Sequence, residues 1–80
     1  MTKNQWQKNK DSLYKTFTFK NFVEAVNFVD KIVPLAEKVN HHPDIKIFAY
    51  KKVKITLTTH EKKMVTSKDV KLSKEIDKIN

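Results

Sequence analysis

The sequence predicts an α+β protein, with a four-stranded antiparallel sheet and helices packed on one face. Two patterns predict this class. Three short segments alternate apolar and polar residues or are rich in β-branched and aromatic ones, which is typical of strands, and a further short strand is expected around Trp6. Two longer segments repeat apolar residues at three- and four-residue steps, which is typical of amphipathic helices. Their order is strand, strand, helix, strand, strand, helix. This order favours helices on one side of an antiparallel sheet.

The first two predicted strands lie around Trp6 and at residues 13–19, with a polar turn at 8–11 between them. The second strand alternates well, and one of its faces carries Leu13, Lys15, Phe17 and Phe19. Because β-branched and aromatic residues dominate the segment, we expect it to be half buried.

The first predicted helix runs from Phe22 to about Val39. Asn21 is a good N-cap, and Glu24 three residues later completes the pattern of a capping box. The predicted core-facing stripe consists of Phe22, Ala25, Val26, Val29, Ile32, Val33 and Ala36. Phe28, Leu35 and Val39 fall outside it, and we expect them to be exposed surface or part of a subunit contact.

The second half of the chain repeats the pattern. Residues 45–48 form a predicted strand, 50–52 a turn, and a further strand faces the core through Val53, Ile55, Leu57 and Thr59. Ser67 is expected to cap the last helix, whose apolar positions are Val70, Leu72, Ile76 and Ile79.

Length and composition place the chain among small proteins of a single domain, residues 1–80. The core is small and no cysteine is present to form a disulfide, so we expect an oligomer. No apolar run approaches the roughly 20 residues that span a bilayer, and the first residues lack the apolar stretch of a signal peptide. We therefore expect a cytoplasmic protein that does not enter membranes.

The formal net charge of +8 comes from lysine alone, because the chain has no arginine. Readers of bases and phosphates favour the planar fork of arginine. The lysines are also scattered along the sequence. This distribution favours a solvated basic surface over a nucleic-acid partner, although the surface could also steer an anionic substrate.

Three histidines are the side chains best suited to chemistry near neutral pH. His41 and His42 follow the first helix, and His60 ends the last strand. The hairpin between them returns the chain to its start, so His60 is expected close to His41. The three could bind a metal, transfer protons or lie unused at the surface.

Other reaction classes fit the sequence poorly. Adjacent histidines point in different directions, which strains a three-histidine metal site. The chain lacks cysteine and glycine, which removes a thiol nucleophile and glycine-rich phosphate loops, and no serine lies in a nucleophile elbow. General acid–base catalysis by histidine remains the best interpretation.

The wider pattern resembles the pterin-4a-carbinolamine dehydratases. The residues that carry the resemblance are Glu37-x3-His41-His42-Pro43, Tyr50, His60 and Asp69, supported by Trp6, Phe17-Thr-Phe19 and Val53-x-Ile-Thr-Leu-Thr-Thr-His60. The likeness extends from residue 6 to about residue 77. It implies the same four-stranded sheet with helices on one face, without the family's N-terminal helix, and assembly into a homodimer or homotetramer.

The resemblance also implies an activity. Such enzymes remove water from 4a-hydroxytetrahydrobiopterin to give quinonoid dihydropterin, without a metal or cofactor. His41 and His60 would act as acid and base, and His42 would mainly hold the pterin. Thr58 and Thr59 would offer hydrogen bonds to the ring.

Two acidic residues complete the expected site. Asp69 matches the family's acidic position, and a first-turn acid that stabilises the last helix is an equal interpretation. Glu37 would orient a neighbouring group. One departure from the family is an extra residue before Tyr50, which predicts a β-bulge beside the site. Another is Ile45, where many members have tryptophan.

Two other functions remain open at this stage. One is action on another pterin, of the molybdopterin or folate type. The second is a non-catalytic dimerisation or interaction module, which would not require three histidines.

Overall fold

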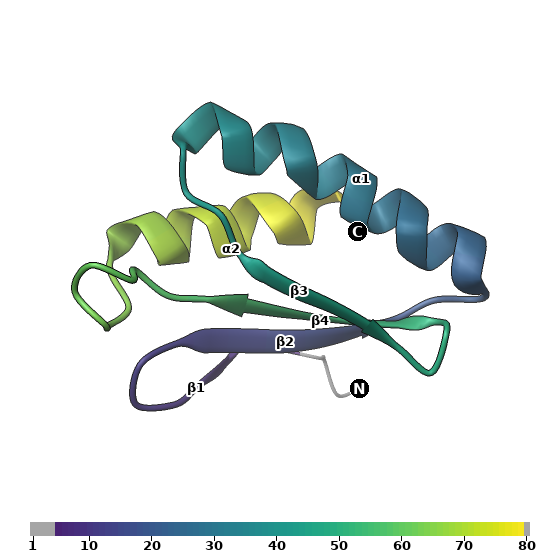
Figure 1. Cartoon of the computed structure of the whole chain (residues 1–80), viewed down its shortest axis with the longest axis horizontal. Helices are drawn as coiled ribbons and strands as arrows, with labels where there is room; N and C mark the ends of the chain where they lie inside the picture. The colour runs from purple at the N-terminus through teal and green to yellow at the C-terminus, as the bar shows by residue number, and fades with distance from the viewer. Residues whose placement is uncertain (1–4, 80) are drawn as a thin grey trace.

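The computed structural model describes residues 5–79 and confirms the predicted order of elements. The elements are β1 (Gln7–Lys8), β2 (Leu13–Thr18), α1 (Phe22–Val39), β3 (Asp44–Phe48), β4 (Lys52–Leu57) and α2 (Ser67–Ile79). The strands form one antiparallel sheet in the order β1-β2-β4-β3. Figure 1 shows α1 and α2 on the same face of this sheet, as predicted. Within residues 5–79, no helix is both long and apolar enough to cross a membrane.

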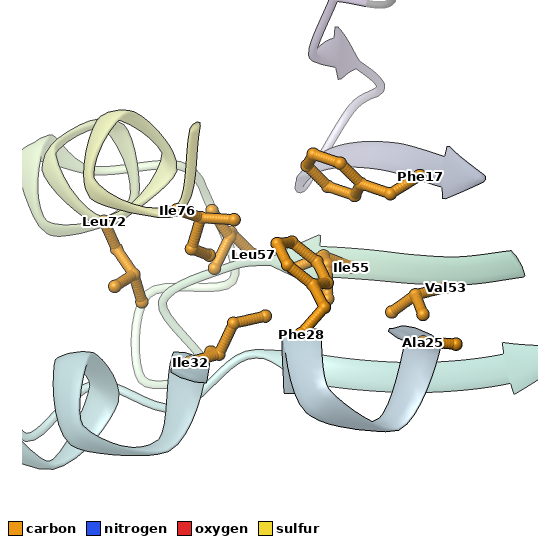
Figure 2. Close-up of a cluster of buried hydrophobic side chains, with 9 residues drawn as sticks. All are labelled: Phe17, Ala25, Phe28, Ile32, Val53, Ile55, Leu57, Leu72 and Ile76. Carbon is orange, nitrogen blue, oxygen red and sulfur yellow. The ribbon is translucent and has the colours of Figure 1, made fainter. Parts of the chain in front are cut away.

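The core lies between the sheet and the two helices (Figure 2). It consists of Phe17 from β2, Val53, Ile55 and Leu57 from β4, Ala25, Phe28 and Ile32 from α1, and Leu72 and Ile76 from α2. The inner strand β4 contributes three residues because β2 and β3 flank it on both sides. Trp6 packs its edge against Phe17, with 6.1 Å between ring centroids, so the segment before β1 also covers the core.

The predicted face of α1 was partly wrong. Phe28 is only 3% exposed and Leu35 packs against the core, whereas Phe22 and Val33 are 54% and 52% exposed. The apolar residues of α1 cover more of its circumference than this small sheet can bury. The helix turns its Ala25, Phe28, Ile32 and Ala36 side to the sheet and leaves part of the predicted stripe in solvent.

The predicted β-bulge beside the histidines was also wrong. Every pair from Asp44↔Thr56 to Phe48↔Lys52 follows without interruption, so β3 contains no extra residue. Three residues join β3 to β4, and two of them, Ala49 and Tyr50, have positive φ. Within this turn the Lys51 N–H donates to the Ala49 carbonyl at 2.6 Å. This turn lies at the opposite end of β3 from the histidines.

Candidate active site

Three connections meet at one end of the molecule, on the left in Figure 1. They are the link from α1 to β3, the loop that follows β4 and the start of α2. The first carries His41 and His42, the second carries His60, and the third carries Asp69. The fold therefore gathers four of the predicted site residues from distant parts of the sequence.

The end of α1 fixes the position of the histidine pair. Asn40 adopts the left-handed conformation, with φ 52° and ψ 45°, and its N–H donates to the carbonyls of Ala36 and Glu37. The His41 N–H donates to the Ala36 carbonyl at 3.1 Å. Glycine usually occupies such a C-terminal position, and asparagine is the most common substitute. Asn40 thus ends the helix and turns the chain toward β3.

A polar cleft of about 430 Å³ lies between these connections. All three histidines line it, and the complete lining is Asn40, His41, His42, Pro43, Asp44, Thr59, His60, Glu61 and Lys68. Its volume lies within the range of small-molecule sites. His60 is exposed and makes no hydrogen bond to another side chain among residues 5–79.

His41 is paired with a buried carboxylate. Its Nε2 lies 2.6 Å from Oδ1 of Asp69, and the exposed fractions of the two side chains are 11% and 0%. Burial, the largest single effect, raises the pKa of Asp69. Hydrogen bonds from His41, Thr66 and Thr59, together with the charge of His41, outweigh it and hold that pKa below its usual value. Asp69 is therefore ionised near neutral pH and accepts the Nε2 proton of His41, which leaves Nδ1 for a reacting proton.

The second oxygen of Asp69 stabilises the start of α2. Asp69 Oδ2 accepts from the Thr66 N–H and from the Thr59 hydroxyl, both at 2.9 Å. The Thr66 carbonyl in turn accepts from the backbone N–H of Asp69, so Thr66 occupies the cap position that we predicted for Ser67. The structure confirms Asp69 as a first-turn acid through its second oxygen, while its first oxygen contacts His41 and its part in a reaction stays a prediction.

His42 has a weaker partner. Its Nε2 also lies 2.6 Å from a carboxylate oxygen, Oε2 of Glu37, but the two side chains are 56% and 67% exposed. Glu37 therefore contacts a neighbouring histidine, as expected, in an environment where water screens the interaction.

Of the two threonines predicted to contact the ring, only Thr59 lines the cleft. Thr58 points to the other side of the strand, and its hydroxyl donates to the Asp11 carbonyl at 2.6 Å. Thr59 is buried and its hydroxyl is shared with Asp69 and Thr66. Thr58 is therefore outside the cleft, whereas Thr59 lines the cleft and donates its hydroxyl to the carboxylate that contacts His41.

Four of the lining residues were not predicted from the sequence: Asn40, Asp44, Glu61 and Lys68. Each is adjacent to a predicted site residue or to Pro43, and this adjacency was the available signal. Among residues 5–79, no group of three or more histidine and acidic side chains is arranged to hold a metal ion.

Comparison with known proteins decides the family. The sequence model described as pterin 4 alpha carbinolamine dehydratase matches residues 1–79. The chain belongs to this family.

Relatives within the family are similar over most of their length. A protein of Sulfolobus acidocaldarius with the provisional name pterin-4-alpha-carbinolamine dehydratase is 47% identical over 92% of this chain and 80% of its own. One of Prochlorococcus marinus with the same provisional name is 46% identical over 92% of this chain and 77% of its own.

Solved structures agree with the fold. A transcriptional coactivator/pterin dehydratase from Brucella melitensis superposes with a TM-score of 0.85 at 36% identity, over 92% of this chain and 80% of that one. A pterin dehydratase-like protein identified as a RuBisCO assembly factor in the alpha-carboxysome has a TM-score of 0.72 at 23% identity, over 95% of this chain and 87% of that one. At that identity the second likeness shows the fold alone.

Proposed function

We propose that this member of the pterin 4 alpha carbinolamine dehydratase family removes water from a 4a-hydroxytetrahydropterin by histidine acid–base catalysis. The observation that carries the proposal is the convergence of His41, His42 and His60 on one cleft, with His41 anchored to the buried Asp69. An interaction module of this fold would need neither the convergence nor the anchor.

The reaction moves two protons and breaks one bond. A base removes the proton from N5 of the pterin while an acid protonates the hydroxyl on C4a. The C4a–O bond then breaks, water leaves, and the N5 lone pair forms the C4a=N5 double bond of the quinonoid product. Substrate and product plus water balance, so no electrons enter or leave. Two imidazoles in opposite protonation states supply both proton transfers.

We assign these transfers to His41 and His60. Asp69 holds the imidazole of His41 in one orientation and stabilises its protonated form, as a buried carboxylate does in other acid–base pairs. His60 is exposed in the cleft and can adjust to the substrate. His42, with its partner Glu37 at the rim, contributes to holding the pterin.

Asp69 and Thr59 act through His41 in this proposal. Their side chains bond to each other and to the start of α2, so they are positioning residues. Glu37 is likewise a positioning residue, and it acts through His42. In this proposal other polar groups that line the cleft form the hydrogen bonds to the pterin ring. Asn40 and Asp44 are candidates, because they lie nearest the histidine pair in sequence.

A second substrate class has one specific observation in its favour. Lys68 lines the cleft, and its ammonium group would attract a negatively charged substituent on the pterin. A phosphorylated or otherwise anionic pterin is therefore the alternative substrate. A Lys68→Gln variant distinguishes the two, because it should raise the KM for an anionic pterin and leave the KM for a neutral one unchanged.

We also propose that the chain forms a homodimer or homotetramer. Four large apolar residues of α1 are exposed, namely Phe22, Val23, Val33 and Val39, and exposed apolar surface can mark a contact with another protein. Sedimentation velocity should detect an oligomer in the wild type, and Val33→Glu should dissociate it. A monomeric wild type would contradict this part of the proposal.

The activity itself is tested by following the absorbance of a freshly generated 4a-hydroxytetrahydropterin with and without the protein. A rate well above the uncatalysed dehydration supports the proposal. An unchanged rate with folded protein contradicts it and favours a binding role without catalysis.

A further inference from the structure

The face of the sheet opposite the helices gathers lysines that are dispersed in the sequence. Side chains alternate across a strand, and Val53 and Ile55 of β4 point into the core. Lys52 and Lys54 therefore point to the outer face. The register places Lys46 of β3 directly opposite Lys54, and Lys52 lies two residues along β4 on the same face.

This triangle of like charges has no acidic partner at its centre. Lys46, Lys52 and Lys54 form no ion pair with a carboxylate among residues 5–79. Asp44 is the one acidic residue in the four strands, and it lies on the same face as Lys46, at the end of β3 next to the cleft. Like charges placed directly opposite in a sheet are destabilising, and an anionic partner would reverse the sign of this contribution.

Two aromatic rings flank the lysines on the same face. Lys54 Nζ lies 5.1 Å from the ring centroid of Tyr14, and Lys46 Nζ lies 5.8 Å from that of Phe48. Tyr14 is opposite Thr56 and Phe48 is opposite Lys52, so the two residues are on the strands either side of β4, and strand geometry separates their Cα atoms by about 16 Å. Both rings are partly exposed.

We propose that this outer face, formed by Tyr14, Lys46, Phe48, Lys52 and Lys54, binds single-stranded nucleic acid. The lysines would contact phosphates, and the two rings would stack on separate unpaired bases. Lysine can make these contacts as a point charge, because phosphate contacts position a strand without reading its bases. A duplex hides the faces of its bases, so the rings favour a single strand.

The test measures the fluorescence anisotropy of a labelled oligothymidylate with the full chain over a series of salt concentrations. The expected dissociation constant is about 10⁻⁵ M at moderate salt. Lys46→Gln/Lys52→Gln/Lys54→Gln should weaken binding about 100-fold at about 0.1 M salt and reduce the slope of log Kd against log salt by about 2.

The matched control is Lys31→Gln/Lys71→Gln/Lys74→Gln, which removes the same charge from exposed positions on the two helices. It should change the dissociation constant by less than about threefold, if contacts and not net charge govern binding. Tyr14→Leu and Phe48→Leu should each weaken binding about tenfold. Melting curves of every variant, and its dehydratase rate, establish that the fold is intact.

Three outcomes would overturn the proposal. One is no binding of the oligothymidylate by the wild type at low salt. A second is equal weakening by the two triple variants, which would show attraction by net charge alone. The third is unchanged affinity in both aromatic variants together with equal competition by duplex DNA and heparin, which would show a general polyanion surface.

Discussion

His41 and Asp69 form a short contact between the cleft and the interior: Nε2 and Oδ1 are 2.6 Å apart, and Asp69 has no exposed side-chain surface. His42 and Glu37 form a contact of the same length in which both groups are more than half exposed. The two pairs share chemistry and differ in burial. They therefore offer a matched comparison of how much a carboxylate contributes to a neighbouring histidine.

Asp69→Asn should lower kcat of the proposed dehydration about 100-fold, because His41 loses the carboxylate that orients it and stabilises its protonated form. Glu37→Gln should lower kcat less than about fivefold, since water screens its pair. Initial rates at a temperature where both variants are folded make the comparison. Equal losses in the two variants would show that burial of the carboxylate has no part in the function.

The stability of the protein should depend on Asp69 in acid. Its folded pKa is lowered below the ordinary value of 3.8. The unfolded chain therefore binds the proton first as the pH falls, and this carboxylate stabilises the fold fully above pH 3.8 and progressively less as the pH falls through its folded pKa.

Urea unfolding from neutral pH down through this range should show that loss in the wild type. In Asp69→Asn the free energy of unfolding should be lower by about 1–3 kcal/mol at neutral pH and should change less with pH below about 4. A steeper acid dependence in the variant than in the wild type would contradict the assignment.

Lys15 is a buried cation on the core side of β2. Its Nζ lies 2.8 Å from Asp77 Oδ1, and the Trp6 Nε1–H donates to the same carboxylate at 3.1 Å. Asp77→Ala should lower the free energy of unfolding by about 1–2 kcal/mol, because the ammonium group loses its partner while the site remains partly open to water.

Lys15→Met should cost less than about 1 kcal/mol, since an apolar side chain of similar length needs no partner. The double variant Lys15→Met/Asp77→Ala should be closer in stability to Lys15→Met than to Asp77→Ala. Urea unfolding measures all three. A loss from Lys15→Met as large as that from Asp77→Ala would show that the ion pair itself is stabilising.

Because the chain has no glycine, a residue with a Cβ atom occupies a strained backbone conformation in the β3–β4 turn. Ala49 has φ 48°, a left-handed conformation in which a Cβ atom is unfavourable. Ala49→Gly should raise the free energy of unfolding by about 1 kcal/mol. Lys71→Gly, at an exposed helical position, should lower it by about 0.5–1 kcal/mol. A destabilised Ala49→Gly variant would show that the turn does not carry this strain.

The sequence predicted the elements well, because they depend on local patterns. The alternation in β2, the Asn21 cap of α1 and the order of strands and helices are all present in the structure. The side of α1 that faces the core was harder to predict. Its apolar residues lie on several sides of the helix, so several orientations would bury apolar surface. Only the width of the sheet decides whether Phe28 or Val33 faces the core.

The candidate site also combines features that local patterns predict with features that depend on packing. The histidines could be predicted together because a hairpin returns the chain to its start. The partner of His41 depends on how α2 packs beside the α1–β3 connection, which no local pattern encodes. Thr58 and Thr59 are adjacent in sequence, and strand alternation sends one to Asp11 and the other to Asp69. The lysines of the outer face are dispersed in the sequence and become neighbours only through strand pairing.

The most direct test of the proposed mechanism is the rate of 4a-hydroxytetrahydropterin dehydration by the wild type, His41→Ala and His60→Ala, with Thr58→Val as a control outside the cleft. The wild type should exceed the uncatalysed rate, each histidine variant should lose about 10²- to 10⁴-fold of kcat, and Thr58→Val should keep nearly full activity. Folded histidine variants that retain the wild-type rate would contradict acid–base catalysis by His41 and His60.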